Sequence, residues 1–469
     1  NNTPLHLASL NGHHQCIEIL LDRQANSTAH NDTHHTALHL AARQGHRQCV
    51  ALLLDRQADI DTRSRNNNTL LHLASMEGHP QCIELLLDRQ ADSTARNDTH
   101  HTALHLAARH GHRQCVALLL DRQADINARD RINNTLLHLA SMEGHPQCIE
   151  LLLDRKADVD ARNDLNATPL HDASAKDHRQ CVALLLDRQA DINAHDSNHK
   201  SPLHLASLKG HHQCIALLLD RQADINAHHS NGNTALHLAS LKGRNQCIAV
   251  LVDHGADINA QNVSNTTPLH LASRYGNYDC VVVLLDRQAN VNAQNVSNTT
   301  PLHLASRYSL HRFVELLLDR QADVNARDSN NNTPLHLASY HQCVATLLDH
   351  GADKSLLNVR VSLSLFWCLR ASLVNGINTT PIDQSQFIAL TPHQNIGLTP
   401  DQSGKDLSIA KLIRNHGTVL LSIKPNQTKE SHIKHLAAAA ADSLSLSLAI
   451  ELQPKEYPQW SIEHHNRAP

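Results

Sequence analysis

The chain has 469 residues, and its 41 lysine and arginine residues against 45 aspartate and glutamate residues give a formal net charge of −4 at pH 7. Because this balance leaves no basic excess, we expect neither nucleic acid nor an anionic membrane surface as a partner. The 40 histidines are neutral at pH 7, so we expect mildly acidic conditions to make the chain strongly positive.

The first residues, NNTPLHLAS, contain neither an initiator methionine nor a signal peptide. They begin inside a phrase that recurs later in the chain. We therefore expect the sequence to be a fragment of a longer protein.

A histidine in a TPLH-type phrase returns every 33 residues along most of the chain. A fixed period of this length predicts helical units that bury their apolar faces against their neighbours. One array then replaces the roughly three domains expected from length alone. The histidines are His6, His39, His72, His105, His138, His171, His204, His237, His270, His303 and His336.

Residues 201–233 illustrate one unit. Pro202 suits the first turn of a helix, because its missing N–H needs no partner there, and Gly210 ends that helix in a left-handed conformation. A second helix starts at residues 211–213 and is expected to bury Cys214, Ile215 and residues 217–219. Residues 223–227 are expected to be extended, and residues 229–233 turn the chain into the next unit.

The phrases TPLHLAS, GHHQCIALLL and ADINA resemble the helix, helix and hairpin signature of the ankyrin repeat family over residues 1–353. The resemblance implies an all-α fold, an ankyrin-repeat α-solenoid with short β-hairpin fingers, with about eleven units of which the first is truncated. It also implies a concave face, formed by the fingers and the first helices, that recognises proteins. For the TPLH histidines it implies hydrogen bonds between hairpins.

Departures from the family's pattern predict strain. Gln24, Gln57 and Lys156 stand where the family places a glycine after the second helix, and a side chain there costs roughly 1 kcal/mol per unit. In unit six, Asp172 replaces the second leucine of TPLHLA, and Asp177 replaces the glycine that ends the first helix. We expect unit six to be the least stable.

Ten of the eleven cysteines occupy one register at the start of the second helix, where a free cysteine behaves as a small buried side chain. Equivalent positions in stacked helices lie roughly 8–10 Å apart, beyond the limit of about 7 Å between the Cα atoms of a disulfide. We therefore expect reduced thiols and a cytoplasmic protein.

Neither catalysis nor a cofactor is predicted. The sequence contains no phosphate-binding loop, dinucleotide fingerprint or zinc-protease motif, and the repeat itself explains the abundance of His, Asp and Ser. Histidine pairs at residues 34–35, 100–101 and 228–229 are candidate metal ligands, because neighbouring fingertips approach one another. Nothing in the sequence brings about four ligands together, so we expect no dedicated metal site and no catalytic residue.

Beyond residue 353 the period breaks. Residues 355–374 are apolar but contain Arg360 and Arg370, so no membrane insertion is expected. This segment is either an insertion or intron sequence translated as protein. Residues 380–383 and 409–413 resemble the two halves of a terminal unit, which makes residues 354–417 a degenerate capping repeat interrupted by insertions. Residues 418–469 carry no recognisable domain pattern, and we expect them to be partly disordered.

The candidate partner-binding residues lie mostly at the end of the first helix, a register at which the family contacts its partners. In the second half of the array this register is basic and ends in aromatic residues, and tyrosine and arginine dominate interface hot spots. The alternative is a solvated repeat face whose residues have drifted. The candidates are Lys176, Lys209, Lys242, Arg274, Tyr275, Arg307, Tyr308 and, in the last unit, Tyr340.

We predict a monomeric, non-enzymatic scaffold that binds proteins along its concave face, with an acidic or acidic–apolar segment as the expected ligand. One alternative is a substrate adaptor whose recruiting module lies outside this sequence. Another is a purely structural spacer, which would have no saturable partner.

Overall fold

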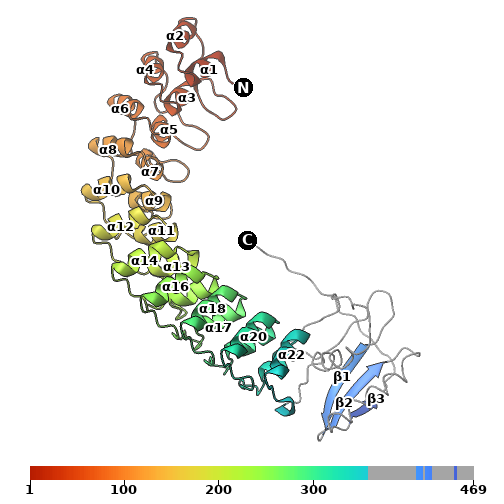
Figure 1. Ribbon diagram of the computed structural model, residues 1–469. Helices are drawn as coiled ribbons and strands as arrows, with labels where there is room; N and C mark the ends of the chain where they lie inside the picture. Colours follow the sequence, from red (N-terminus) through yellow and green to blue (C-terminus); the bar gives the residue numbers. More distant parts are fainter. Residues whose placement is uncertain (357–407, 416–417, 425–447, 452–469) are drawn as a thin grey trace. The chain divides into compact units, whose positions relative to one another are not determined.

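The computed structural model describes residues 1–356, 408–415, 418–424 and 448–451 (Figure 1). The chain divides into two compact units, Asn1–Ile377 and Asn378–Pro469. In the described residues, the first contains 22 α-helices and the second contains three β-strands.

The helices alternate between two sets and form eleven two-helix units. The first helices are α1 (Pro4–Leu10), α3 (Ala37–Arg43), α5 (Leu70–Glu77), α7 (Ala103–Arg109), α9 (Leu136–Glu143), α11 (Pro169–Ala175), α13 (Pro202–Lys209), α15 (Ala235–Leu241), α17 (Pro268–Arg274), α19 (Pro301–Arg307) and α21 (Pro334–Leu337). The second helices are α2 (His14–Asp22), α4 (Arg47–Asp55), α6 (Pro80–Asp88), α8 (Arg113–Asp121), α10 (Pro146–Asp154), α12 (Arg179–Asp187), α14 (His212–Asp220), α16 (Asn245–Asp253), α18 (Tyr278–Asp286), α20 (His311–Asp319) and α22 (His341–Asp349), followed by the 3-10 helix η1 (Lys354–Leu356).

The helical units stack in a curved row (Figure 1). From α1 to α13 the first helices lie on the concave side of this row, and from α2 to α14 the second helices lie on its convex side (Figure 1). Each first helix packs against the first helices of the neighbouring units and against the second helix of its own unit. The prediction of a helical repeat solenoid is therefore confirmed.

The TPLH phrase starts each first helix by reciprocal hydrogen bonding. At α17, the Thr267 hydroxyl oxygen accepts a bond from the His270 backbone N–H (3.5 Å), and His270 Nδ1 accepts one from the Thr267 N–H (3.2 Å). The same capping box begins all eleven first helices, with serine in place of threonine only at Ser201. Two otherwise unpaired N–H groups are satisfied, which fixes where each helix begins.

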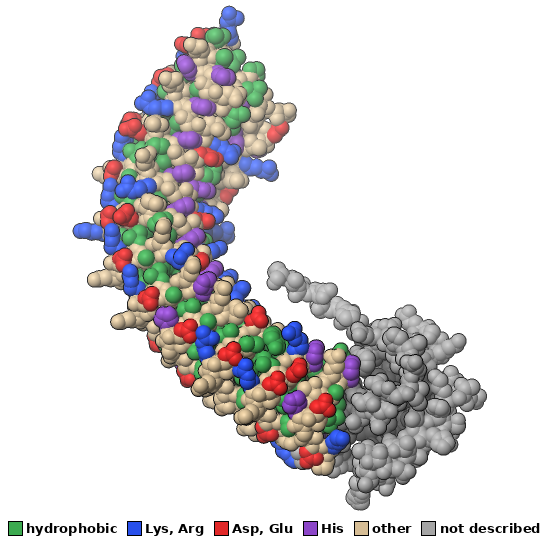
Figure 2. Space-filling model, in the orientation of Figure 1, with side chains coloured by type: hydrophobic (Ala, Val, Ile, Leu, Met, Phe, Trp, Pro, Cys, Tyr) green, Lys and Arg blue, Asp and Glu red, His purple; other side chains and the backbone are tan. Residues whose placement is uncertain are grey.

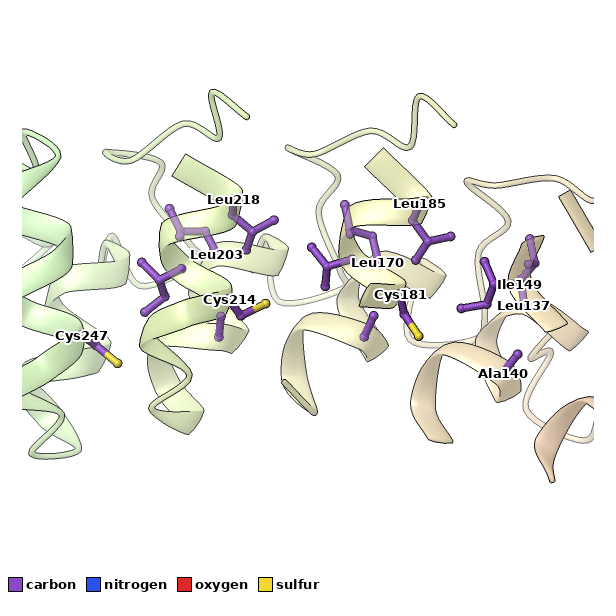
Figure 3. Close-up of a cluster of buried hydrophobic side chains, with 14 of the residues drawn as sticks. Leu137, Ala140, Ile149, Leu170, Cys181, Leu185, Leu203, Cys214, Leu218 and Cys247 are labelled. Atoms are coloured by element: carbon purple, nitrogen blue, oxygen red, sulfur yellow. The ribbon is translucent and has the colours of Figure 1, made fainter. Parts of the chain in front are cut away.

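The apolar core runs from unit to unit along the row. In its middle section, Leu170, Cys181 and Leu185 of unit six lie between Ile149 of unit five and Leu203 of unit seven (Figure 3). Each unit thus buries its apolar faces against both neighbours, as expected for a solenoid. The second-helix core differs from its prediction in one respect, because Leu218 is fully buried while residues 217 and 219 are only partly buried.

The cysteine column is structural, with one exception. All ten cysteines in the described residues are free thiols and nine are buried, whereas Cys16 is exposed. In the described residues α2 packs against one second helix, α4, whereas an interior second helix such as α10 packs against two, α8 and α12. Burial raises the pKa of Cys115 and of Cys181 to about 12, so these thiols stay protonated at neutral pH.

The fingers between units are tight turns, and residues 1–356 contain no β-strand. In one finger, the His229 N–H donates to the Asn233 carbonyl (3.0 Å) and the Gly232 N–H donates to the His229 carbonyl (2.8 Å). Neighbouring fingertips are joined by single backbone bonds, such as that from the Val296 N–H to the Ser264 carbonyl (3.0 Å). With one backbone bond between tips, the expected short hairpins do not extend into a strand ladder.

The strained positions predicted from the sequence are confirmed. Gln24, Gln57 and Lys156 each have φ of +64°, and Asp177 has φ of +62°. In all, 20 non-glycine residues of the described chain lie in this left-handed region. Since each costs on the order of 1 kcal/mol relative to glycine, the array is less stable than one with glycine at these sites.

The second compact unit contains β1 (Ser408–Asn415), β2 (Thr418–Lys424) and β3 (Leu448–Glu451). β1 pairs with β2 in antiparallel fashion, and β2 pairs with β3 in parallel. Residues 409–413 therefore form part of a strand and not the second helix expected of a capping unit, since the β-branched residues of β2 provide a partner suited to a sheet. Most of the remaining predicted cap and tail, including residues 357–407, lies outside the described residues.

Candidate partner-binding surface

The predicted cations occupy one structural position, the end of the first helix in successive units. Lys176 and Lys242 are the C-cap residues of α11 and α15, and Lys209 is the last residue of α13. Arg274 and Arg307 end α17 and α19. All five are exposed. Because successive first helices pack against one another, these five residues form one row along the stack of first helices, which we call the basic row.

Ion pairing distinguishes the basic row from the same register in earlier units. Arg43 Nε lies 3.1 Å from Glu77 Oε1, and Arg109 Nε lies 3.3 Å from Glu143 Oε1. Within the described residues, no carboxylate oxygen lies within 4.0 Å of a charged nitrogen of the basic row. The early units therefore present neutral pairs, whereas the later units present uncompensated positive charge.

Two tyrosines adjoin the basic row. Tyr275 and Tyr308 are the C-cap residues of α17 and α19, and they are 53% and 46% exposed. The guanidinium carbon of Arg274 lies 5.5 Å from the centroid of the Tyr275 ring, a cation–π arrangement that favours one orientation of the ring. Exposed aromatic rings beside cations are typical of interface hot spots.

The other tyrosines of the last units take different positions. Tyr278 begins α18 and packs edge-on against Phe313, with ring centroids 5.4 Å apart. Tyr340 is the N-cap residue of α22, is 37% exposed, and has its ring centroid 4.6 Å from that of His341. It does not end a first helix as Tyr275 does, because α21 has only four residues in the shortened last unit. Tyr340 therefore belongs to a different element from Tyr275 and Tyr308.

Four exposed apolar residues at fingertips were missed in the sequence. Ile132 and Leu165 lie in neighbouring fingers and are 52% and 63% exposed, and Val263 and Val296 form a second neighbouring pair at 72% and 62%. The equivalent residues of the other fingers are Thr, Asn, Asp, Arg or Ser. A comparison of the turn phrases alone would have revealed this difference.

Eight of the TPLH histidines donate from Nε2 to a carbonyl of the next finger, which is the role that the family resemblance implied, whereas Nε2 of His39 and of His105 has no hydrogen-bond partner among the described residues. His138 Nδ1 accepts a hydrogen bond from the Thr135 N–H (3.1 Å), so the proton resides on Nε2, which donates to the Ala167 carbonyl of the next finger (2.9 Å). Burial lowers the pKa of His138 to about 4 and that of His105 to about 3. The expectation that mild acid charges the histidines is therefore wrong for the nine members of this column whose pKa is lowered by burial.

A second set of histidines joins each of units two to seven to the preceding unit, and Figure 2 shows histidines following one another along the first half of the array. In each, Nε2 donates to a carbonyl near the end of the preceding first helix, over 2.8–3.1 Å. These bonds connect the start of a second helix to the end of the first helix in the preceding unit. The set is His46, His79, His112, His145, His178 and His211.

The described residues contain no group of three or more His, Cys, Asp or Glu side chains placed to hold a metal ion. Members of the candidate histidine pairs have partners nearby, since His228 Nδ1 donates to the Gly232 carbonyl (2.8 Å) and His101 Nε2 lies 3.5 Å from Asp130 Oδ2. In the same part of the chain, every helix is too short or too polar to span a bilayer.

Comparison with known protein families gives a match along nearly the whole array. The family model described as "Ankyrin repeats (3 copies)" matches residues 1–64, 58–130, 131–196, 203–295 and 269–358. A search of curated proteins finds no match. Among solved structures, 561 chains match. One is the crystal structure of the human ASB11 ankyrin repeat domain, which is 27% identical, has a TM-score of 0.44, and covers 47% of this chain and 98% of that chain.

Proposed function

Because this chain belongs to the ankyrin repeat family, whose repeats generally mediate protein–protein interactions, we propose that it is a monomeric, non-enzymatic scaffold that binds proteins along the second half of its concave face. The bound partner carries an acidic or acidic–apolar segment. This segment lies against the basic row and contacts Tyr275, Tyr308 and Tyr340. The protein acts in the reducing environment of the cytoplasm, where its free thiols remain reduced.

The distribution of exposed hydrophobic side chains is the observation that carries this proposal. In residues 34–355, every large hydrophobic side chain that is exposed lies either at a fingertip or in the turn after a first helix. Tyrosine is enriched among the residues that contribute most to binding at protein interfaces. These residues are Ile132, Leu165, Val263, Tyr275, Val296, Tyr308 and Tyr340.

The charge pattern supports an acidic ligand. The five cations of the basic row have no carboxylate partners in the described residues, so a partner's carboxylates would not have to displace existing ion pairs. Charges at the rim of an interface mainly raise the association rate, whereas buried aromatic anchors mainly slow dissociation. The basic row therefore steers the ligand and the tyrosines hold it.

Partner capture with the full chain, followed by binding kinetics, tests the proposal. Replacing Lys176, Lys209 and Lys242 together by serine should slow association and flatten its dependence on salt. Tyr275→Ala with Tyr308→Ala should speed dissociation by roughly 30-fold, corresponding to about 2 kcal/mol. Lys156→Ser, at the end of a second helix on the convex side, is the matched control and should change neither rate.

A captured partner that binds equally well to both sets of variants would remove the second half of the concave face as the site. The apolar fingertips of units four and five would then be the next candidate. The substrate-adaptor alternative predicts the same contacts with an additional effector module. The spacer alternative predicts no saturable binding at all.

A further inference from the structure

Unit six differs from the other units by two carboxylates, both partly enclosed and both incompletely hydrogen bonded. Asp172 Oδ2 and Asp177 Oδ1 are buried atoms without a hydrogen-bond partner among the described residues. In the other units, leucine occupies the position of Asp172, and glycine occupies that of Asp177 in all but units ten and eleven. A buried acceptor that lacks a partner destabilises the folded state, because it has lost its water without compensation.

Asp172 interrupts a row of leucines. The equivalent residues of the neighbouring units are Leu139, which is 4% exposed, and Leu205, and their helices α9 and α13 pack on either side of α11. Removal from water raises the pKa of Asp172 to about 7, and Lys176 one turn later only partly offsets this effect. Lys176 makes no ion pair with it, since no Lys176–Asp172 contact occurs within 4.0 Å.

Asp177 places a side chain where its neighbours have no room for one. At Gly144 of unit five, an added Cβ would lie 2.6 Å from the ring of His178 in the next unit, and the distances at the four preceding glycines are 2.4–2.7 Å. The histidine facing Asp177 is His211, and its bond to the Ala175 carbonyl (3.1 Å) is the longest of the six such bonds. Asp177 also adopts the left-handed conformation, with φ of +62°.

We propose that unit six is a joint at which the array opens locally, so that units one to five and units seven to eleven behave as two separately cooperative blocks. In a solenoid each unit is held only by its neighbours, so one weak unit in the middle uncouples the two sides. Lys176, the first cation of the basic row, lies in the joint itself. Opening would therefore change the orientation of the rest of the basic row relative to the early units.

The sequence supplies matched reporters of local opening. Helices α4, α8 and α12, in units two, four and six, share the sequence RQCVALLLD. Their cysteines, Cys49, Cys115 and Cys181, are each 1% exposed. A buried thiol reacts only when its surroundings open, so the three labelling rates compare opening in three chemically identical helices.

The test is labelling of the full-length native chain with iodoacetamide, with each cysteine quantified by mass spectrometry. We expect Cys181 to react at least tenfold faster than Cys115. The double variant Asp172→Leu with Asp177→Gly should bring the two rates within about twofold, whereas Ser309→Gly, which relieves a left-handed residue in unit ten, should leave the ratio unchanged. Both substitutions in the double variant restore the residues of neighbouring units, so folding is preserved.

Two results would overturn the joint: equal labelling of Cys181 and Cys115 in the unaltered protein, or rapid labelling of Cys181 that persists in the double variant. The joint does not depend on the proposed function. A failure of partner capture would leave the labelling ratio unaffected, and equal labelling rates would leave the binding site untested.

Discussion

Mild acid should unfold the array, because its buried histidines cannot accept protons while the fold persists. Nine members of the TPLH column have a pKa lowered chiefly by burial, and for seven of them it falls to about 3 or 4. Protonation would place a hydrogen on Nδ1, directly opposite the threonine or serine N–H that donates to it in the capping box. These seven are His39, His72, His105, His138, His204, His237 and His270.

The sign and size of the effect follow from proton linkage. Above pH 6.5 these histidines are neutral in both the folded and the unfolded chain, so they add no pH dependence. Between about pH 6.5 and 4 the unfolded chain binds protons that the folded chain refuses, and the free energy of unfolding falls. At pH 5 the loss is about 2 kcal/mol for each histidine. If the whole array unfolds together, seven histidines remove on the order of 14 kcal/mol, comparable with the total stability of a typical domain.

Urea unfolding followed by circular dichroism between pH 7.5 and 5 measures this directly. The slope of the free energy of unfolding against pH, summed over all unfolding transitions of the array, should correspond to an uptake of about six protons near pH 5. His138→Gln should lower this uptake by about one proton. A slope of fewer than about two protons near pH 5 would refute the assignment of these histidines as neutral, buried caps.

Three further outcomes follow from individual residues. Asp172→Leu should raise the free energy of unfolding by about 2 kcal/mol more at pH 8 than at pH 5, as measured by denaturation at both pH values. The reason is that folding raises the pKa of the Asp172 carboxyl to about 7, so the free-energy cost of burying it grows as pH rises. Gly144→Ala should destabilise the array by more than Gly255→Ala, since an added Cβ lies 2.6 Å from a histidine ring at Gly144 and has no atom within 4 Å at Gly255; equal losses would contradict the steric argument. Gln189→Gly should raise the melting temperature, gaining up to about 1 kcal/mol at a residue with φ of +65°, and a lowered one would show that the side chain contributes packing.

The regular features of this array could be predicted because they follow from local rules. The 33-residue period predicted the pairs of helices. The presence of Asp177 at a position that is glycine in most other units was enough to predict its left-handed backbone conformation. The two tyrosines of one short segment could not be told apart in the same way. Tyr275 is exposed after α17, while Tyr278, three residues later, packs on Phe313 of the next unit, and only the stacking of units decides between them.

Charge states and the end of the array also escaped prediction. The neutrality of the TPLH histidines depends on a carbonyl 29 residues away and on burial by the next finger, neither of which a single unit contains. Residues 409–413 have an apolar pattern compatible with helix or strand, and their pairing with β2 decides it. The exposed apolar residues at the fingertips were not predicted, because a single apolar residue in a turn belongs to no periodic pattern of a helix or strand.

The histidine bonds between units carry a consequence for how this chain can change in length. Each of these bonds spans either 29 or 36 residues, and within each set the histidines are separated by 33 residues or by a multiple of 33. If the chain gains or loses one whole repeat, each remaining histidine still faces an equivalent carbonyl in the neighbouring unit. An insertion of any other length in the interior breaks both the 29-residue and the 36-residue bonds at that place. Residues 34–99 and 100–165, which differ at only nine positions, show that such a copy has been accepted. The number of repeats in the array can therefore vary, whereas the length of each repeat is fixed by the histidine bonds to its neighbours.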